Sequence, residues 1–137
     1  MSARRPPADR DRGSLSIVMM FLMVIVLAGA ALIVDGGRAM TARRHAANTA
    51  EAAARSAVAN QSLTGGFDPA AAAARARSHA QRSGIASADI QVAINYDPDP
   101  QVIVTITEHP STVFLVLGGA NDMTVRATGA ARFVYSL

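Results

Sequence analysis

The sequence contains no cysteine, which excludes disulfide bonds, cysteine-ligated zinc sites and cysteine nucleophiles. Tryptophan and lysine are also absent, and only 4 Phe and 2 Tyr represent the aromatic residues. Apolar residues make up 50% of the chain, but many of them are alanines, which bury little area per residue. We therefore expect a domain with a thin core, held by close packing, by a membrane anchor or by partners.

The charges are distributed unevenly along the 137 residues. Residues 1–60 contain 8 arginines against 4 acidic residues, a net charge of +4, whereas residues 61–137 contain 5 arginines against 6 acidic residues, a net charge of −1. A nucleic-acid-binding domain needs its basic residues on the folded part of the chain. This distribution argues against a nucleic-acid partner.

Side chains that could perform chemistry are scattered. His45, His79 and His109 lie far apart and match no histidine spacing known from metal sites, and the prolines between and after Asp97 and Asp99 indicate a turn rather than a calcium loop. The sequence has no G-x-S-x-G nucleophile motif and no phosphate-binding loop of the Walker type. We expect no catalytic residues, metal, cofactor or small-molecule substrate, and therefore no enzyme.

One long hydrophobic run dominates the N-terminal part of the chain. Residues 15–34 contain no charge, and about 20 apolar residues suffice for a helix to cross the hydrocarbon core of a membrane. We therefore predict a tail at 1–13 and a transmembrane helix at 14–35. Arginines flank the run on both sides, so the positive-inside rule does not fix the orientation. The short tail favours a single-pass protein with its N-terminus in the cytoplasm and its C-terminal domain outside.

A cleaved signal peptide is the alternative interpretation of the same run. Ala28, Gly29 and Ala30 fit the small-residue cleavage pattern, and 17–27 would be the hydrophobic region of the peptide. The product would be a secreted or cell-surface binding domain. Against this alternative, the apolar run continues through 31–34, and cleavage after Ala30 would leave these residues at the new N-terminus.

Helical character continues beyond the run. Residues 38–59 are rich in alanine and contain no proline, while Gly36 and Gly37 weaken the helix between the two segments. We predict one helix over 14–59, about 70 Å long, with a bend at the two glycines and an outer continuation over 36–60. Small residues recur on one face of this continuation, which packs either on the protein's own sheet or on neighbouring subunits: Ala39, Ala42, Ala46, Ala50, Ala53 and Ala57.

The remaining residues, 61–137, predict a small α+β head. Asp68 and Pro69 mark the start of a second helix that extends to residue 82. Alternating apolar residues predict strands at 90–96 and 101–108, joined as a hairpin by 97–100. A short helix or turn at 110–117 and a last strand within 123–137 complete the head. We expect a short antiparallel sheet packed against the outer half of the first helix.

Two segments resemble the TadE/TadG-like proteins of Tad (Flp-type) pilus assembly. The N-terminal match consists of Arg12-Gly13-Ser14, the junction Val34-Asp35-Gly36-Gly37-Arg38 and the alanine-rich 46–54. At the C-terminal end, Val113-Phe114-Leu115 with Gly118, and then 125–131, are similar to the ending of such proteins. The resemblance implies a pilin-like plan and a membrane-anchored structural role in pilus assembly or secretion, with pilin subunits or other assembly proteins as partners in the cytoplasmic membrane.

Two departures from the family pattern limit what the resemblance implies. Processing by a prepilin peptidase would cut between Gly13 and Ser14, but Val18 stands where pseudopilins have Glu at the fifth mature position. The chain also has no von Willebrand A-type domain with its D-x-S-x-S motif, which long TadG-like proteins carry. Because of Val18, the sequence resembles the unprocessed TadG-like branch more than the TadE-like pseudopilin branch. Asp35 is expected to mark the membrane boundary or to pair with Arg38 or Arg43.

Overall fold

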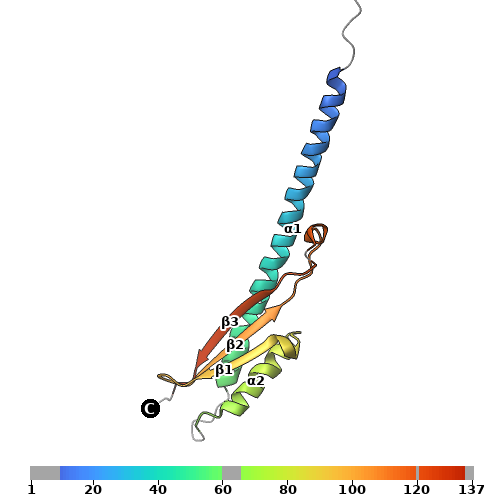
Figure 1. Ribbon diagram of the computed structural model, residues 1–137. Coiled ribbons are helices and arrows are strands. Elements are labelled where there is room, and N and C mark those ends of the chain that lie inside the picture. Colours follow the sequence, from blue (N-terminus) through green and yellow to red (C-terminus); the bar gives the residue numbers. More distant parts are fainter. Residues whose placement is uncertain (1–9, 60–65, 120, 135–137) are drawn as a thin grey trace, which may run out of the picture.

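A computed structural model describes residues 10–59, 66–119 and 121–134. Helix α1 extends over Arg10–Ala59, 50 residues, and continues through Gly36 and Gly37 without interruption (Figure 1). At 1.5 Å per residue its length is about 75 Å. The predicted single long helix is confirmed, and the two glycines do not break it. The segment expected to end it, 60–65, lies outside the described residues.

Helix α2, Pro69–Arg82, begins as its sequence predicts. The Asp68 side chain accepts hydrogen bonds from the backbone N–H groups of Ala70 (2.9 Å) and Ala71 (3.2 Å), which have no partner within the first helical turn. Pro69 lacks an N–H and therefore loses nothing at the first helical position. The predicted helix over 68–82 is thus confirmed together with its cap.

The head contains a three-stranded antiparallel sheet in the order β1-β2-β3, with β1 at Ile90–Asn95, β2 at Gln101–Glu108 and β3 at Val125–Arg132. Asn95 pairs with Gln101, which closes the predicted hairpin across residues 96–100. A short 3-10 helix, η1 (Ser87–Asp89), precedes β1. The expected α+β class with a short antiparallel sheet is confirmed.

Both helices cover the same face of this sheet. One buried cluster contains alanines of α1 and α2 together with Val102, Val104 and Ile106 of β2, all with 0% exposure. Figure 1 shows the sheet and α2 gathered around the C-terminal half of α1, while the N-terminal half extends beyond them. The part of the alanine stripe from Ala46 to Ala57 therefore packs on the protein's own sheet and second helix, the first of the two predicted alternatives, whereas Ala39 and Ala42 are half-buried and lie outside this cluster.

The closest approach between the layers is at Gly129 of β3. A Cβ atom added there would overlap the backbone of Ala50 and Glu51 in α1. Gly129 pairs with Val104 of β2, and the backbone of α1 lies against its face, so both neighbours restrict its position. Only a hydrogen fits between the strand and the helix at this position. The core predicted to be thin from the composition is therefore so thin here that the two backbones are in contact.

The connection between β2 and β3 forms an extended loop that reaches along α1 (Figure 1). Its base is closed by the bridge between Ser111 and Asp122 and by a hydrogen bond from the Met123 N–H to the Pro110 carbonyl (3.2 Å). Its tip is the 3-10 helix η2, Leu115–Gly118, which ends at Gly119 in a left-handed conformation (φ 87°). The predicted short helix at 110–117 is thus a single turn at the tip of a loop.

Candidate functional site at the membrane junction

The N-terminal half of α1 is apolar and lies outside the core. Its large apolar side chains, from Leu15 to Val34, have exposed fractions between 43% and 76%. It is the one helix within the described residues that is long and apolar enough to cross a membrane, with a mean hydropathy of 3.1 in its most apolar window. The core helix of a soluble protein would bury such residues. An exposed run of this length fits a single-pass membrane helix.

Asp35 immediately follows this apolar run, yet its side chain is only 1% exposed. Oδ1 accepts a hydrogen bond from the Val113 N–H (2.9 Å), and Oδ2 accepts hydrogen bonds from the N–H groups of Phe114 (3.0 Å) and Leu115 (2.9 Å). Leu115 is the first residue of η2, and Val113 and Phe114 immediately precede it; N–H groups at the start of a helical turn have no partner within the turn. Asp35 thus attaches the β2–β3 loop to α1 across 78 residues of sequence.

This arrangement suits a carboxylate. Three backbone N–H donors favour its ionised form, and hydrogen bonds to a charged acceptor are about twice as strong as those between neutral groups. The sequence suggested boundary marking or pairing with Arg38 or Arg43 and did not identify the loop as a partner. One signal was available, because the Asp35 junction and Val113-Phe114-Leu115 both belong to the segments that carry the family resemblance.

The other residues predicted for the junction are exposed. A Cβ atom added at Gly36 or Gly37 would meet no atom within 4 Å, so no contact within the described chain requires a glycine there. Arg38 is also exposed, and Gly13 and Ser14 lie exposed on the first turns of α1. Arg38 nevertheless interacts electrostatically with the Asp35 carboxylate, one of the pairings suggested by the sequence. Processing between Gly13 and Ser14 stays a prediction.

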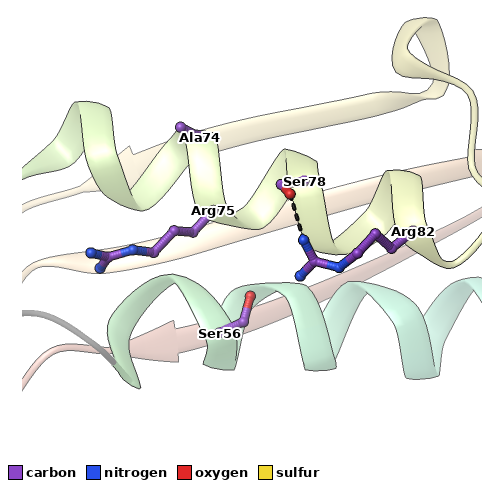
Figure 2. Close-up of a pocket in the computed structure, with 5 residues that line it drawn as sticks. All are labelled: Ser56, Ala74, Arg75, Ser78 and Arg82. Carbon is purple, nitrogen blue, oxygen red and sulfur yellow. Dashed lines mark hydrogen bonds between the residues drawn. The ribbon is translucent and has the colours of Figure 1, made fainter.

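A basic groove lies between α1 and α2, with a volume of about 340 Å³ (Figure 2). Ser56 of α1 lines it together with Arg75, Ser78 and Arg82 of α2. Arg82 donates a hydrogen bond to the Ser78 hydroxyl (2.6 Å), whereas Nη1 of Arg75 is buried and has no hydrogen-bond partner within the described part of the chain. Guanidinium groups recognise carboxylates and phosphates, so the groove can accept an anionic group.

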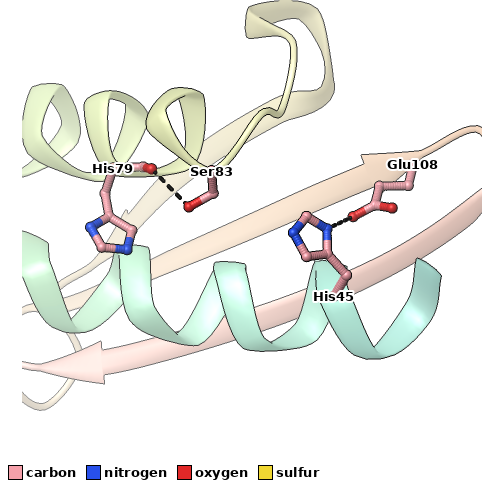
Figure 3. A network of polar contacts seen from close by, with 4 residues as sticks. All are labelled: His45, His79, Ser83 and Glu108. Atoms are coloured by element: carbon pink, nitrogen blue, oxygen red, sulfur yellow. Dashed lines mark hydrogen bonds and ion pairs between the residues drawn. The ribbon is translucent and has the colours of Figure 1, made fainter. Parts of the chain in front are cut away.

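Two histidines make contacts on the side of the head that faces the junction. His45 Nδ1 of α1 lies 2.6 Å from Oε1 of Glu108 at the end of β2 (Figure 3), and His109 Nε2 lies 3.3 Å from Oδ1 of Asp89. His79 is on α2, where its carbonyl accepts a hydrogen bond from the Ser83 hydroxyl (3.2 Å). These pairs connect elements of the head. Within residues 10–59, 66–119 and 121–134, no three His, Asp or Glu side chains are grouped so that they could bind a metal ion.

Comparison with known proteins identifies the N-terminal module. Residues 13–60 match the family model described as putative Flp pilus-assembly TadE/G-like. The match covers the apolar half of α1, the junction and the continuation of α1 into the head, and it confirms the predicted family resemblance for this part of the chain. Neither the curated proteins nor the solved structures contain a match to this chain.

Proposed function

We propose that this chain, which carries a TadE/G-like module at residues 13–60, is a membrane-anchored structural component of a Tad/Flp-type pilus-assembly or secretion apparatus. It acts as a minor pseudopilin or as an assembly factor and performs no catalysis. The observation that carries the proposal is the continuity of α1, because one uninterrupted helix joins an exposed apolar half to a half buried in the head. Such a helix couples the position of the head directly to the membrane.

The orientation of this helix is part of the proposal. We place the N-terminus in the cytoplasm and the folded head, which follows the apolar run, outside. Because the chain has no cysteine, a thiol reagent labels only a cysteine that is introduced, and its accessibility shows on which side of the membrane that position lies. An impermeant maleimide should label Gln91→Cys, an exposed strand position, in intact cells, and should label Ser2→Cys only after lysis.

Deletion of the gene tests the functional assignment. We expect cells without this chain to lose their pili or to carry fewer, and expression of the wild-type chain to restore them. Unchanged piliation in the deletion strain would contradict the assignment. N-terminal sequencing of the mature protein separates three forms: Ser14 at the terminus indicates a processed pseudopilin, Ala31 a secreted domain, and an intact terminus a permanent anchor.

The basic groove is the surface that we propose for a partner subunit. Arg75 and Arg82 line it, and guanidinium groups recognise carboxylates, so the groove suits an acidic segment of another assembly protein. Charge reversal in Arg75→Glu with Arg82→Glu should reduce piliation while the isolated protein still folds. Arg77→Glu is the matched control, because Arg77 is an exposed arginine of the same helix that does not line the groove. Equal effects of the two changes would contradict this contact.

A further inference from the structure

The tip of the β2–β3 loop exposes apolar side chains that the head does not use. Val113, Phe114 and Val116 are 45%, 40% and 46% exposed. Exposed apolar side chains that are contiguous in this way mark a contact with a membrane or another protein. The position of the loop decides between these two occupants.

Asp35 fixes the height of the loop along α1. Its carboxylate binds the N–H groups of Val113, Phe114 and Leu115, and Val34, the residue before it, is the last of the apolar run. The apolar run has 20 residues, so its length of about 30 Å matches the hydrocarbon core of a bilayer. If that run spans the membrane, the loop tip lies at the level where the helix leaves the hydrocarbon.

Basic residues lie on the head side of the loop tip, since Arg43 comes eight residues after Asp35, about 12 Å farther along α1. A groove of about 400 Å³ between α1 and the start of β3 is lined by Gly36 and Met40 together with Arg43 and Arg126. Both arginines are exposed. Guanidinium groups next to apolar side chains match the layered chemistry of a membrane surface, with phosphates above the acyl chains. This charge complementarity, and the continuity with the apolar run, favour lipid over a protein partner.

We propose that residues 113–116 form a second membrane contact, which enters the interfacial layer of the leaflet where α1 emerges. The contact rests on the proposed membrane anchor. A helix alone leaves the head free to rotate about the helix axis and to tilt. A second contact, fixed to α1 by Asp35, sets one side of the head against the lipid and thereby presents the basic groove and the outer face of the sheet in a defined direction.

Tryptophan fluorescence in lipid vesicles tests the proposal, because the chain has no tryptophan of its own. The full chain with Phe114→Trp is reconstituted into vesicles whose lipids carry quenching bromines either near the headgroup or near the acyl-chain end. We expect bromines near the headgroup to quench this tryptophan more than bromines near the chain end. Two single-tryptophan variants serve as references. Ile25→Trp lies in the middle of the apolar run, and Tyr96→Trp lies in the β1–β2 turn, at the opposite end of the sheet.

The references separate failure of the loop contact from failure of the anchor. If Ile25→Trp is quenched by the deep bromines while Phe114→Trp is quenched no more than Tyr96→Trp, the loop proposal is overturned and the anchor stands. If Ile25→Trp is not quenched, the anchor and the loop contact both fail. Adding Asp35→Ala to Phe114→Trp should reduce the quenching toward that of Tyr96→Trp, and an unchanged depth profile would overturn the role assigned to Asp35.

Discussion

The two halves of α1 are built from different apolar residues. The half within 15–34 contains large side chains such as Leu, Ile, Met and Phe, which lie exposed, whereas the half within 46–57 buries alanines at 0% exposure. In a lipid environment, large apolar side chains are favourable, and they need not match the shape of a neighbouring surface. A helix packed on a sheet instead gains from small side chains, because they let the backbones approach. The same helix thus meets two different surroundings, and its residue sizes change where the surroundings change.

The half of α1 that packs on the sheet should tolerate added volume least. The strand that covers it comes closest at Gly129 of β3. Gly129→Val forces branched atoms into the backbone of Ala50 and Glu51, so we expect a loss of about 3 kcal/mol or more in the free energy of unfolding. Urea unfolding of the full chain in detergent, followed by circular dichroism, measures this loss. Ala130→Val is the matched control, because Ala130 is the next strand residue and is exposed. Equal stability of the two variants would show that the layers are not in contact at Gly129.

The apolar half should tolerate added volume but not charge. Ile25→Arg places a guanidinium in the middle of the apolar run, and a central arginine disfavours insertion by roughly 3 kcal/mol. The fraction of the protein that remains in the membrane pellet after alkaline extraction should therefore fall. Met40→Arg is the control, since Met40 is an exposed residue of the same helix beyond the run. If the membrane pellet retained as much Ile25→Arg as wild type, this half of α1 would not be a membrane-spanning segment.

At the boundary between the halves, Asp35 should control the order of the β2–β3 loop. Asp35→Asn keeps the shape but replaces one acceptor oxygen by an N–H₂ donor that faces N–H groups, so we expect a loss of about 2 kcal/mol from loop attachment. Amide hydrogen exchange at Val113, Phe114 and Leu115 should become faster. Asp122→Asn, an exposed carboxylate at the base of the same loop, should leave these rates unchanged. Unchanged exchange in Asp35→Asn would mean that the carboxylate does not hold the loop.

The smallest effect is expected at Gly37, where we expect a substitution to raise the stability instead of lowering it. Nothing lies within 4 Å of an added Cβ, so Gly37→Ala should stabilise the helix by up to about 1 kcal/mol, whereas Gly129→Ala should destabilise the head. Thermal unfolding of both variants in detergent gives the comparison. A destabilised Gly37→Ala would indicate a neighbour that the chain alone does not contain. Reduced piliation with unreduced stability would assign that neighbour to a partner subunit.

Patterns within single segments were sufficient to predict most elements of the fold. The uncharged run at 15–34, the Asp68-Pro69 cap and the alternation in 90–96 and 101–108 each carry a local physical signal, and each element is found in the structure. Hydrophobic periodicity also indicated that the alanine face of α1 would be covered. It did not distinguish the protein's own sheet from a neighbouring subunit, because alanine suits both.

Contacts between distant segments were beyond the reach of such patterns. Gly129 shared one face of its strand with apolar residues, but nothing local showed that the α1 backbone would lie against it. The partner of Asp35 is 78 to 80 residues away, and an aspartate next to a membrane helix has closer arginines that are equally suitable by spacing. Similarly, Arg75 and Arg82 line a groove only because α2 packs beside Ser56 of α1.

The sequence by itself determined the long helix, the apolar span, the family resemblance and the α+β head, because composition and periodicity act over a few turns or strands. Tertiary structure alone decided that Asp35 holds the β2–β3 loop and that Gly129 meets Ala50. These contacts depend on the register of the sheet against α1, which brings one carboxylate to three N–H donors and one glycine to a helix backbone. Register is a property of the packed layers, and no single segment encodes it.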